Sequence, residues 1–275
     1  MKNPIPCLKA GEQTVYFKAG GEWCFLRTPK TYQPFDKKVP CVIQCHGNGG
    51  YVKDGESDWL TENFKLEFIN SLTNKGIAVA SSHATGNHWG RPSAVHANAA
   101  LFDALVNGSN VDRGRIGLWG GGLGGALLWN SVTGPLLGQL RAVVLQQATI
   151  SYESVIRNQK FKGDLLSAYG IPAESSDELS IASLQFNDPV HRTRLLVEQK
   201  GRALVSELPE VLFVHGDQDE NMLYEENPVR LSHILSPLGA PFSFHTFEGV
   251  GHATYQLGDT AAKVLTDFFG SVFFT

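Results

Sequence analysis

The chain has 275 residues, of which 42% are hydrophobic and 18% are charged, and its formal net charge is −4. An apolar fraction of this size can fill the core of a folded domain, which excludes an intrinsically disordered chain. The excess of 27 acidic over 23 basic residues argues against a nucleic-acid-binding surface, because such surfaces carry an excess of Lys and Arg.

The first residues, MKNPIPCLKAGEQ, contain no apolar run of the kind found in signal peptides. We therefore expect a cytoplasmic or already processed protein. The four cysteines all lie within the first 45 residues, and they show neither a C-x-x-C pair nor a zinc-ligand spacing. We expect them to be reduced thiols and predict no metal site.

The hydrophobic pattern predicts an early β-rich segment followed by alternating strands and helices. Strands are predicted at 14–18, 22–27, 39–45, 77–81, 115–119, 141–146, 211–214 and 242–247. Helices are predicted at 59–74, 93–106, 123–132, 228–235 and 260–269. Such alternation is typical of a mostly parallel sheet that is flanked by helices on both faces, so we expect an α/β fold.

Two segments need a separate interpretation. Residues 116–140 carry no charge and superficially resemble a membrane span, but their glycines, proline and polar residues favour a buried element of the core. Residues 151–208 are more polar and are predicted to be helical without a strong strand. Because no repeat or low-complexity linker is visible, we interpret residues 151–208 as a small cap-like insertion in a single domain, 1–275.

Six glycines lie in the nine residues 117–125, after a predicted strand and before a predicted helix. Two interpretations fit a glycine run in this place. One is a dinucleotide-binding loop, because Gly120, Gly122 and Gly125 satisfy G-x-G-x-x-G. The other is a nucleophile elbow, G-x-S-x-G, in which Gly120 and Gly124 flank the tip and Gly122 stands where the serine belongs.

The context of this run favours the elbow. A dinucleotide loop normally follows the first strand of its fold, with an acidic residue about 20 positions further on. Here more than a hundred residues precede the run, and the next predicted strand ends in Gln146 and Gln147.

Three further motifs occur in the order that the elbow interpretation predicts. His46-Gly47 follows an earlier strand, where the N–H groups of an oxyanion hole are expected. The segment 215–219, HGDQD, follows a late strand, where a carboxylate should orient the base. The segment 249–252, GVGH, follows the last strand, where the base itself is expected, so the chain order is nucleophile, acid, histidine.

On these motifs the chain, from about residue 14 to residue 269, resembles the α/β-hydrolase superfamily, in particular its esterase, dienelactone-hydrolase-like and peptidase-like branches. The resemblance implies that Asp219 is the acid of a catalytic triad and that His252 is the general base. It also implies an oxyanion hole formed by the backbone N–H of Leu123 together with that of Gly47 or Asn48. No cofactor is expected for this chemistry.

The sequence departs from the family pattern at position 122, because glycine offers no nucleophile. Three interpretations stay open: a serine replaced by glycine through engineering, a natural loss of the nucleophile, or a different chemistry in the same pocket. We expect a serine-hydrolase scaffold that cleaves an ester, thioester, lactone or amide bond, present here in a nearly inactive form. The alternative is a natural ligand-binding or non-hydrolytic protein on this fold. Asp217 is the second candidate for the acid.

The substrate side of the site is less clearly marked. Asn87, His88 and Trp89 follow the predicted strand 77–81 at the sheet edge where ligands bind in open α/β sheets, so they are candidates for substrate binding. A packed loop with a buried tryptophan is the equal alternative. The expected partner is a small-molecule substrate, not a nucleic acid or a membrane, and the sequence leaves the oligomeric state open.

Overall fold

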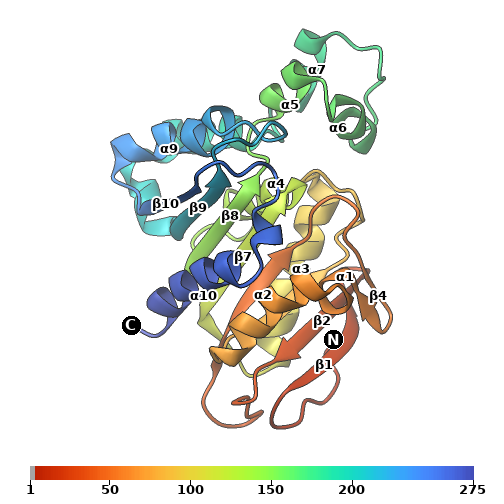
Figure 1. The fold of residues 1–275 in the computed structure, drawn as a ribbon, viewed down its shortest axis with the longest axis vertical. Helices are drawn as coiled ribbons and strands as arrows, with labels where there is room; N and C mark the ends of the chain where they lie inside the picture. Colours follow the sequence, from red (N-terminus) through yellow and green to blue (C-terminus); the bar gives the residue numbers. More distant parts are fainter. Residues whose placement is uncertain (1–3) are drawn as a thin grey trace.

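The computed structural model describes residues 4–275 and places an eight-stranded sheet at the centre of the molecule (Figure 1). Its strands are β1 (Gln13–Ala19), β2 (Glu22–Thr28), β3 (Val39–Cys45), β6 (Ala78–Ser82), β7 (Val111–Gly122), β8 (Ala142–Ala148), β9 (Glu210–Gly216) and β10 (Phe242–Phe247). A separate small hairpin pairs β4 (Val52–Lys53) with β5 (Glu56–Ser57).

The strands lie in the order β1-β2-β6-β3-β7-β8-β9-β10. The pairs β1–β2 and β2–β6 are antiparallel, and all other neighbours are parallel. Because β3, β7, β8, β9 and β10 run in one direction, the loops that follow them meet at one edge of the sheet. The predicted α/β fold with a mostly parallel sheet is confirmed.

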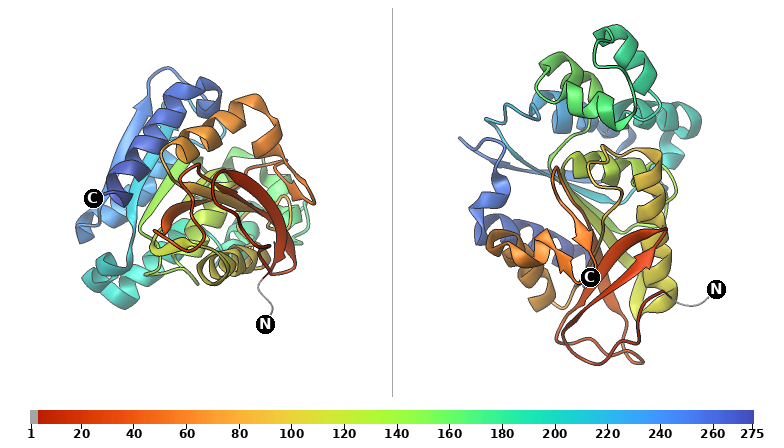
Figure 2. Two further views of the ribbon diagram at one scale, coloured as in Figure 1. Left: turned by 90° about the horizontal axis from the view of Figure 1, so that it is seen from below. Right: turned by 90° about the vertical axis from the view of Figure 1, so that its right-hand side faces the viewer.

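Helices cover both faces of the sheet (Figure 2). They are α1 (Asp58–Thr61), α2 (Asn63–Asn74), α3 (Pro92–Gly108), α4 (Leu123–Val132), α5 (Tyr152–Asn158), α6 (Lys162–Ala168), α7 (Asp177–Leu184), α8 (Pro189–Lys200), α9 (Arg230–Leu235) and α10 (Asp259–Phe273). Short 3₁₀ or π turns are η1 (Gly201–Glu207), η2 (Glu225–Val229), η3 (Ser236–Leu238) and η4 (Thr254–Leu257).

The alternation of side chains along the strands produces two apolar cores. On β3, Cys41 and Ile43 face a core that is shared with α3 and α4, whereas Val42 faces a core that is shared with α2 and α10. All seven residues of β3 are buried, as expected for a parallel strand with helices on both faces. The loops that follow the parallel strands therefore start from a sheet that is packed on both faces.

Two element predictions need correction. The predicted helix 59–74 is interrupted at Glu62, whose backbone is extended (φ −89°, ψ 122°) between α1 and α2. Apolar residues on both sides of the break pack on the same core, so the periodic pattern does not record it. The predicted helix 228–235 begins as a regular α-helix only at Arg230, after the π turn η2 that contains Pro228.

Residues 151–208 contain α5 to α8 and η1, and no strand is assigned within this described segment. Figure 1 shows α5, α6 and α7 beyond the end of the sheet that carries the start of α4. No helix formed by residues 4–275 combines the length and apolar character that a bilayer crossing requires.

Candidate active site

Strand β7 passes into helix α4 through a sharp turn at Gly122. The backbone of Gly122 has φ +52° and ψ −130°, a region that side-chain-bearing residues adopt only at a cost. A Cβ atom built on Gly122 would lie 3.9 Å from Nε2 of His252 and within 4 Å of no other group beyond its chain neighbours. A side chain at position 122 would therefore point at the histidine across open space.

The neighbouring glycines are required by close packing. A Cβ on Gly124 would lie 2.2 Å from the carbonyl oxygen of Cys45, and one on Gly120 would lie 2.5 Å from the carbonyl oxygen of Gly124. A Cβ on Gly125 would lie 2.2 Å from that of Ala148. These contacts explain the glycine run by the shape of a strand–turn–helix elbow, without a bound phosphate.

Asp219 and His252 come together from the loops after β9 and β10. Nδ1 of His252 donates to Oδ2 of Asp219 at 2.8 Å. Because a carboxylate only accepts, Nδ1 carries the proton and Nε2, which faces position 122, is left as the basic nitrogen. The Asp219 side chain is fully buried, whereas 21% of the His252 side chain is exposed.

Asp219 is itself held on all sides. Its Oδ1 accepts from the backbone N–H groups of Asn221 and Met222 at 2.9 Å each, and its Oδ2 lies 3.2 Å from Nε2 of His215. Burial raises the pKa of Asp219, but the hydrogen bonds from His215 and His252 outweigh burial and lower this pKa well below its ordinary value. The carboxylate is therefore charged at neutral pH and can stabilise a protonated His252.

The structure places Asp217, the second candidate acid, elsewhere. Asp217 is exposed, and its Oδ1 accepts from the backbone N–H of Gly249 at 2.7 Å. It braces the loop that leads to His252 and does not face the imidazole.

Three residues with backbone N–H groups of interest lie in the lining of the cavity. Gly47, Asn48 and Leu123, which the sequence marks as oxyanion-hole candidates, all line the same cavity as Gly122 and His252. Within residues 4–275, none of the three N–H groups donates a hydrogen bond to a protein acceptor. Because unpaired amide donors are costly, they favour a ligand that brings an acceptor oxygen.

The substrate-binding candidates separate in the structure. Oδ1 of Asn87 accepts from the backbone N–H of Gly49 at 2.9 Å and so holds the loop that follows β3. His88 is fully buried, with Nε2 3.2 Å from the carbonyl oxygen of His46, and burial lowers its pKa well below the ordinary value. Of Asn87, His88 and Trp89, only Trp89 lines the cavity.

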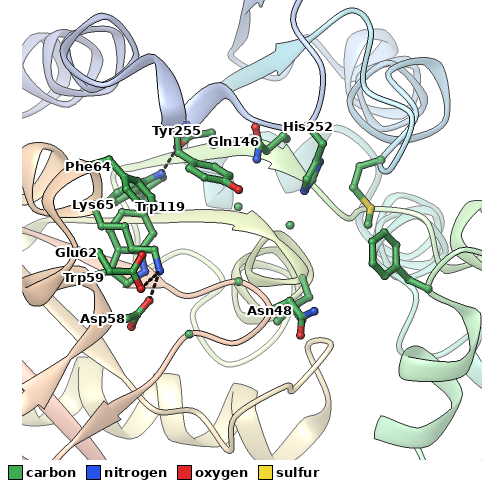
Figure 3. A pocket seen from close by; sticks show the side chains of 18 of the residues that line it. Asn48, Asp58, Trp59, Glu62, Phe64, Lys65, Trp119, Gln146, His252 and Tyr255 are labelled. Atoms are coloured by element: carbon green, nitrogen blue, oxygen red, sulfur yellow. Dashed lines mark hydrogen bonds and ion pairs between the residues drawn. The ribbon is translucent and has the colours of Figure 1, made fainter.

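The cavity measures about 430 Å³ and extends well beyond the elbow. Figure 3 shows His252 on one side and Lys65, between Asp58 and Glu62, on the other. Nζ of Lys65 lies 2.8 Å from Oδ2 of Asp58 and 3.0 Å from Oε1 of Glu62. Sequence reasoning missed this side because the break between α1 and α2, which sets the directions of these side chains, is not visible in the pattern.

A buried polar network that was also missed anchors the loop of His252. Gln147 accepts through Oε1 from both the N–H and the hydroxyl of Thr254, at 2.7 and 2.6 Å. Gln146 donates to Thr254 at 3.0 Å and accepts from Nε1 of Trp119 at 2.8 Å. The signal was present in the sequence, since two glutamines end an otherwise apolar strand.

In the described part of the chain, no cluster of three or more His, Cys, Asp or Glu residues could hold a metal ion.

Comparisons with known proteins agree with this architecture. A model of the prolyl oligopeptidase family matches residues 64–273. A puromycin-hydrolysing peptidase from Mycobacterium tuberculosis has a TM-score of 0.72 and 18% identity, with 98% of this chain and 40% of that chain covered. This chain thus spans about 40% of the length of that peptidase.

Two similar structures are matched over nearly their whole length. A truncated carbohydrate esterase from gut microbiota has a TM-score of 0.72 and 16% identity, with 98% of this chain and 100% of that chain covered. An S-formylglutathione hydrolase from Agrobacterium tumefaciens has a TM-score of 0.69 and 11% identity, with 98% of each chain covered. At these identities the likeness shows the fold alone. No curated protein sequence matches the chain.

Proposed function

Because this chain belongs to the prolyl oligopeptidase family, within the α/β-hydrolase superfamily, we propose that its cavity is a serine-hydrolase site that lacks only the nucleophile. The substrates of such a site are compounds with an ester, thioester, lactone or amide bond. The observation that carries this proposal is the 3.9 Å distance between Nε2 of His252 and the Cβ position of residue 122, with Asp219 bonded to the opposite nitrogen.

The proposed chemistry follows from the positions of these groups. The substrate carbonyl oxygen accepts from the N–H of Leu123 and from that of Gly47 or Asn48. With a serine at position 122, His252 takes the hydroxyl proton as the oxygen attacks, and Asp219 stabilises the imidazolium. One oxyanion donor contributes about 3–4 kcal/mol to such a transition state. His252 then protonates the leaving group and activates the water that releases the acyl group.

With glycine at position 122, the same site binds the acyl group, but no acyl-enzyme can form. This form is therefore expected to be nearly inactive as a serine hydrolase. The rival function, a ligand-binding protein that never had a nucleophile, shares the fold and the cavity. Placing a serine at position 122 distinguishes the two functions, because only a hydrolase site has the base and the oxyanion donors correctly positioned for catalysis.

We also propose that residues 151–208 act as a cap over the cavity. Phe161, from this segment, lines the cavity together with Gly47, Asn48 and His252. The hydroxyl groups of Tyr152 and Tyr169 both donate to the carbonyl oxygen of Trp89, which ties the segment to the cavity wall. The shape of the cavity on this side, and the exclusion of water from it, would then depend on the cap.

The test is the hydrolysis of 4-nitrophenyl acetate by a Gly122→Ser variant. We expect turnover in this variant and its loss when His252→Ala is added, with His233→Gln as a matched control, because His233 is exposed and lies outside the cavity. A Gly122→Ser protein that folds normally but is no more active than the double variant would contradict the proposal and favour the ligand-binding alternative.

A further inference from the structure

The space between Gly122 and His252 has the size and the partners of a water site. A Cβ atom at position 122 would stand in this space, and nothing other than Nε2 of His252 comes within 4 Å of it apart from its chain neighbours. A buried water needs about the room of one probe sphere and 2–4 polar partners. In the free protein, Nε2 of His252 and the N–H of Leu123 supply such partners, and once a substrate carbonyl occupies the N–H of Leu123 the water keeps Nε2 of His252 as its partner.

The base in this space is held independently of residue 122. Asp219 fixes the ring of His252 through Nδ1, and the buried bonds between Gln147 and Thr254 fix the loop two residues further on. None of these contacts involves a side chain at position 122. A basic nitrogen is therefore directed at the water position even though the chain has no serine there.

The electrophile can be held in the same place. The unpaired N–H groups of Leu123 and of Gly47 or Asn48 would bind the carbonyl oxygen of an acyl compound, as in the proposed function on which this inference rests. The carbonyl carbon then lies near the water position. General base catalysis contributes about 10²- to 10⁴-fold when base, water and carbon are aligned.

We propose that the chain as it stands hydrolyses activated acyl esters and thioesters by direct attack of this water. The water oxygen forms a bond to the carbonyl carbon while Nε2 of His252 takes one proton. The tetrahedral intermediate then breaks its bond to the leaving group, which receives the proton from His252. The products are the free acid and an alcohol or thiol, with no covalent intermediate and no further reactant.

The experiment measures steady-state hydrolysis of 4-nitrophenyl acetate and of phenyl acetate by the unchanged chain after treatment with a fluorophosphonate. The treatment inactivates any contaminating serine hydrolase but leaves a water-based route intact. The variants are His252→Ala, which removes the base, and Gly122→Ala, which places a methyl group in the water position. His233→Gln is the control.

We expect turnover that resists the fluorophosphonate and shows no initial burst. Hydrolysis of phenyl acetate should be slower, because without a covalent intermediate the departure of the leaving group is part of every turnover and influences its rate. Both His252→Ala and Gly122→Ala should lower the rate at least about tenfold, since each removes the general base or its water. The control should match the unchanged chain. A rate that is abolished by the fluorophosphonate, or one that is equal in His252→Ala, overturns the inference.

The proposed function can fail separately. If Gly122→Ser reacts with the fluorophosphonate while the unchanged chain shows no turnover that depends on His252, the water route is wrong and the proposed function stands. If the unchanged chain turns over through His252 but Gly122→Ser forms no covalent adduct, the water route stands and the proposed acyl-enzyme chemistry is wrong.

Discussion

The two halves of the site are built by different means. The elbow, residues 117–125, takes its shape from the backbone and depends on glycine. Cβ atoms at Gly120, Gly124 and Gly125 would collide with neighbouring atoms. The acid–base half, residues 215–219 and 249–254, takes its shape from side-chain hydrogen bonds around Asp219 and Thr254.

This difference explains how the site can keep its geometry with glycine at position 122. A side chain at position 122 would support nothing in the elbow, since its Cβ would have only Nε2 of His252, at 3.9 Å, within 4 Å apart from its chain neighbours. In the acid–base half, by contrast, Asp219, His252 and Thr254 are each held by hydrogen bonds to other side chains. The elbow should therefore tolerate a change at position 122 but not at its flanking glycines, whereas the acid–base half should depend on single polar atoms.

The largest expected effect is in the acid–base half. In the Gly122→Ser background, Asp219→Asn should lower kcat/KM by about 10⁴-fold, because an amide favours the wrong tautomer of the histidine and cannot stabilise its charge. Asp217→Asn is the matched variant, since Asp217 only accepts from Gly249, and it should retain most of the activity. Steady-state ester hydrolysis measures both, and equal losses would contradict the assignment of Asp219.

In the elbow, Gly124→Ala should be the most destabilising change. Its new Cβ would lie 2.2 Å from the carbonyl oxygen of Cys45, so the backbone must shift, at a cost of about 3 kcal/mol in the free energy of unfolding. Gly163→Ala in α6 is the control, because its Cβ meets nothing within 4 Å, and it should stabilise by up to about 1 kcal/mol. Urea unfolding compares them, and a neutral Gly124→Ala would be contrary to the packing account.

Gly122→Ala should fall between these two variants. Its Cβ has room, so the cost is that of holding alanine at φ +52°, about 1–3 kcal/mol. The same urea measurement applies. A destabilisation as large as that of Gly124→Ala would show that position 122 is packed as tightly as its neighbours, which would remove the contrast within the elbow.

The smallest expected effect is on pH dependence. The folded chain holds the pKa of Asp219 below the unfolded value of about 3.9, so the unfolded state takes up the proton first as the pH falls. The stabilisation is thus fully present above about pH 4 and is lost as the pH falls through the folded pKa. Asp219→Asn should flatten the decline in unfolding free energy below about pH 4, and identical curves would argue against a stabilised carboxylate.

Much of the fold follows from the sequence because strand and helix periods are strong over long elements. The boundaries of β3, β10 and α4 agree with the predicted ranges, since turns or glycines end each run abruptly. The hairpin of β4 and β5 was missed because each strand has only two residues. No hydrophobic period can form over such a length.

The site could be predicted where a motif directly follows a strand. It could not be predicted where the contacts of a side chain depend on the direction that a loop takes. The glycine run and the motifs ending at Asp219 and His252 stand at strand ends, where topology alone brings them to one edge. The positions of Asn87 and His88 could not be derived, because a turn with φ +45° at Ala84 and φ +68° at Thr85 redirects the chain before them. Those angles leave no mark in composition or period.

The central claim is that only a nucleophile is missing from this site. Its most direct test is the reaction of Gly122→Ser with a fluorophosphonate, followed by intact mass and by mapping of the modified peptide. The account predicts one adduct on the residue at position 122, none on the unchanged chain, and none when His252→Ala is added. A folded Gly122→Ser protein that forms no adduct, or an unchanged chain that reacts equally well, would contradict the claim.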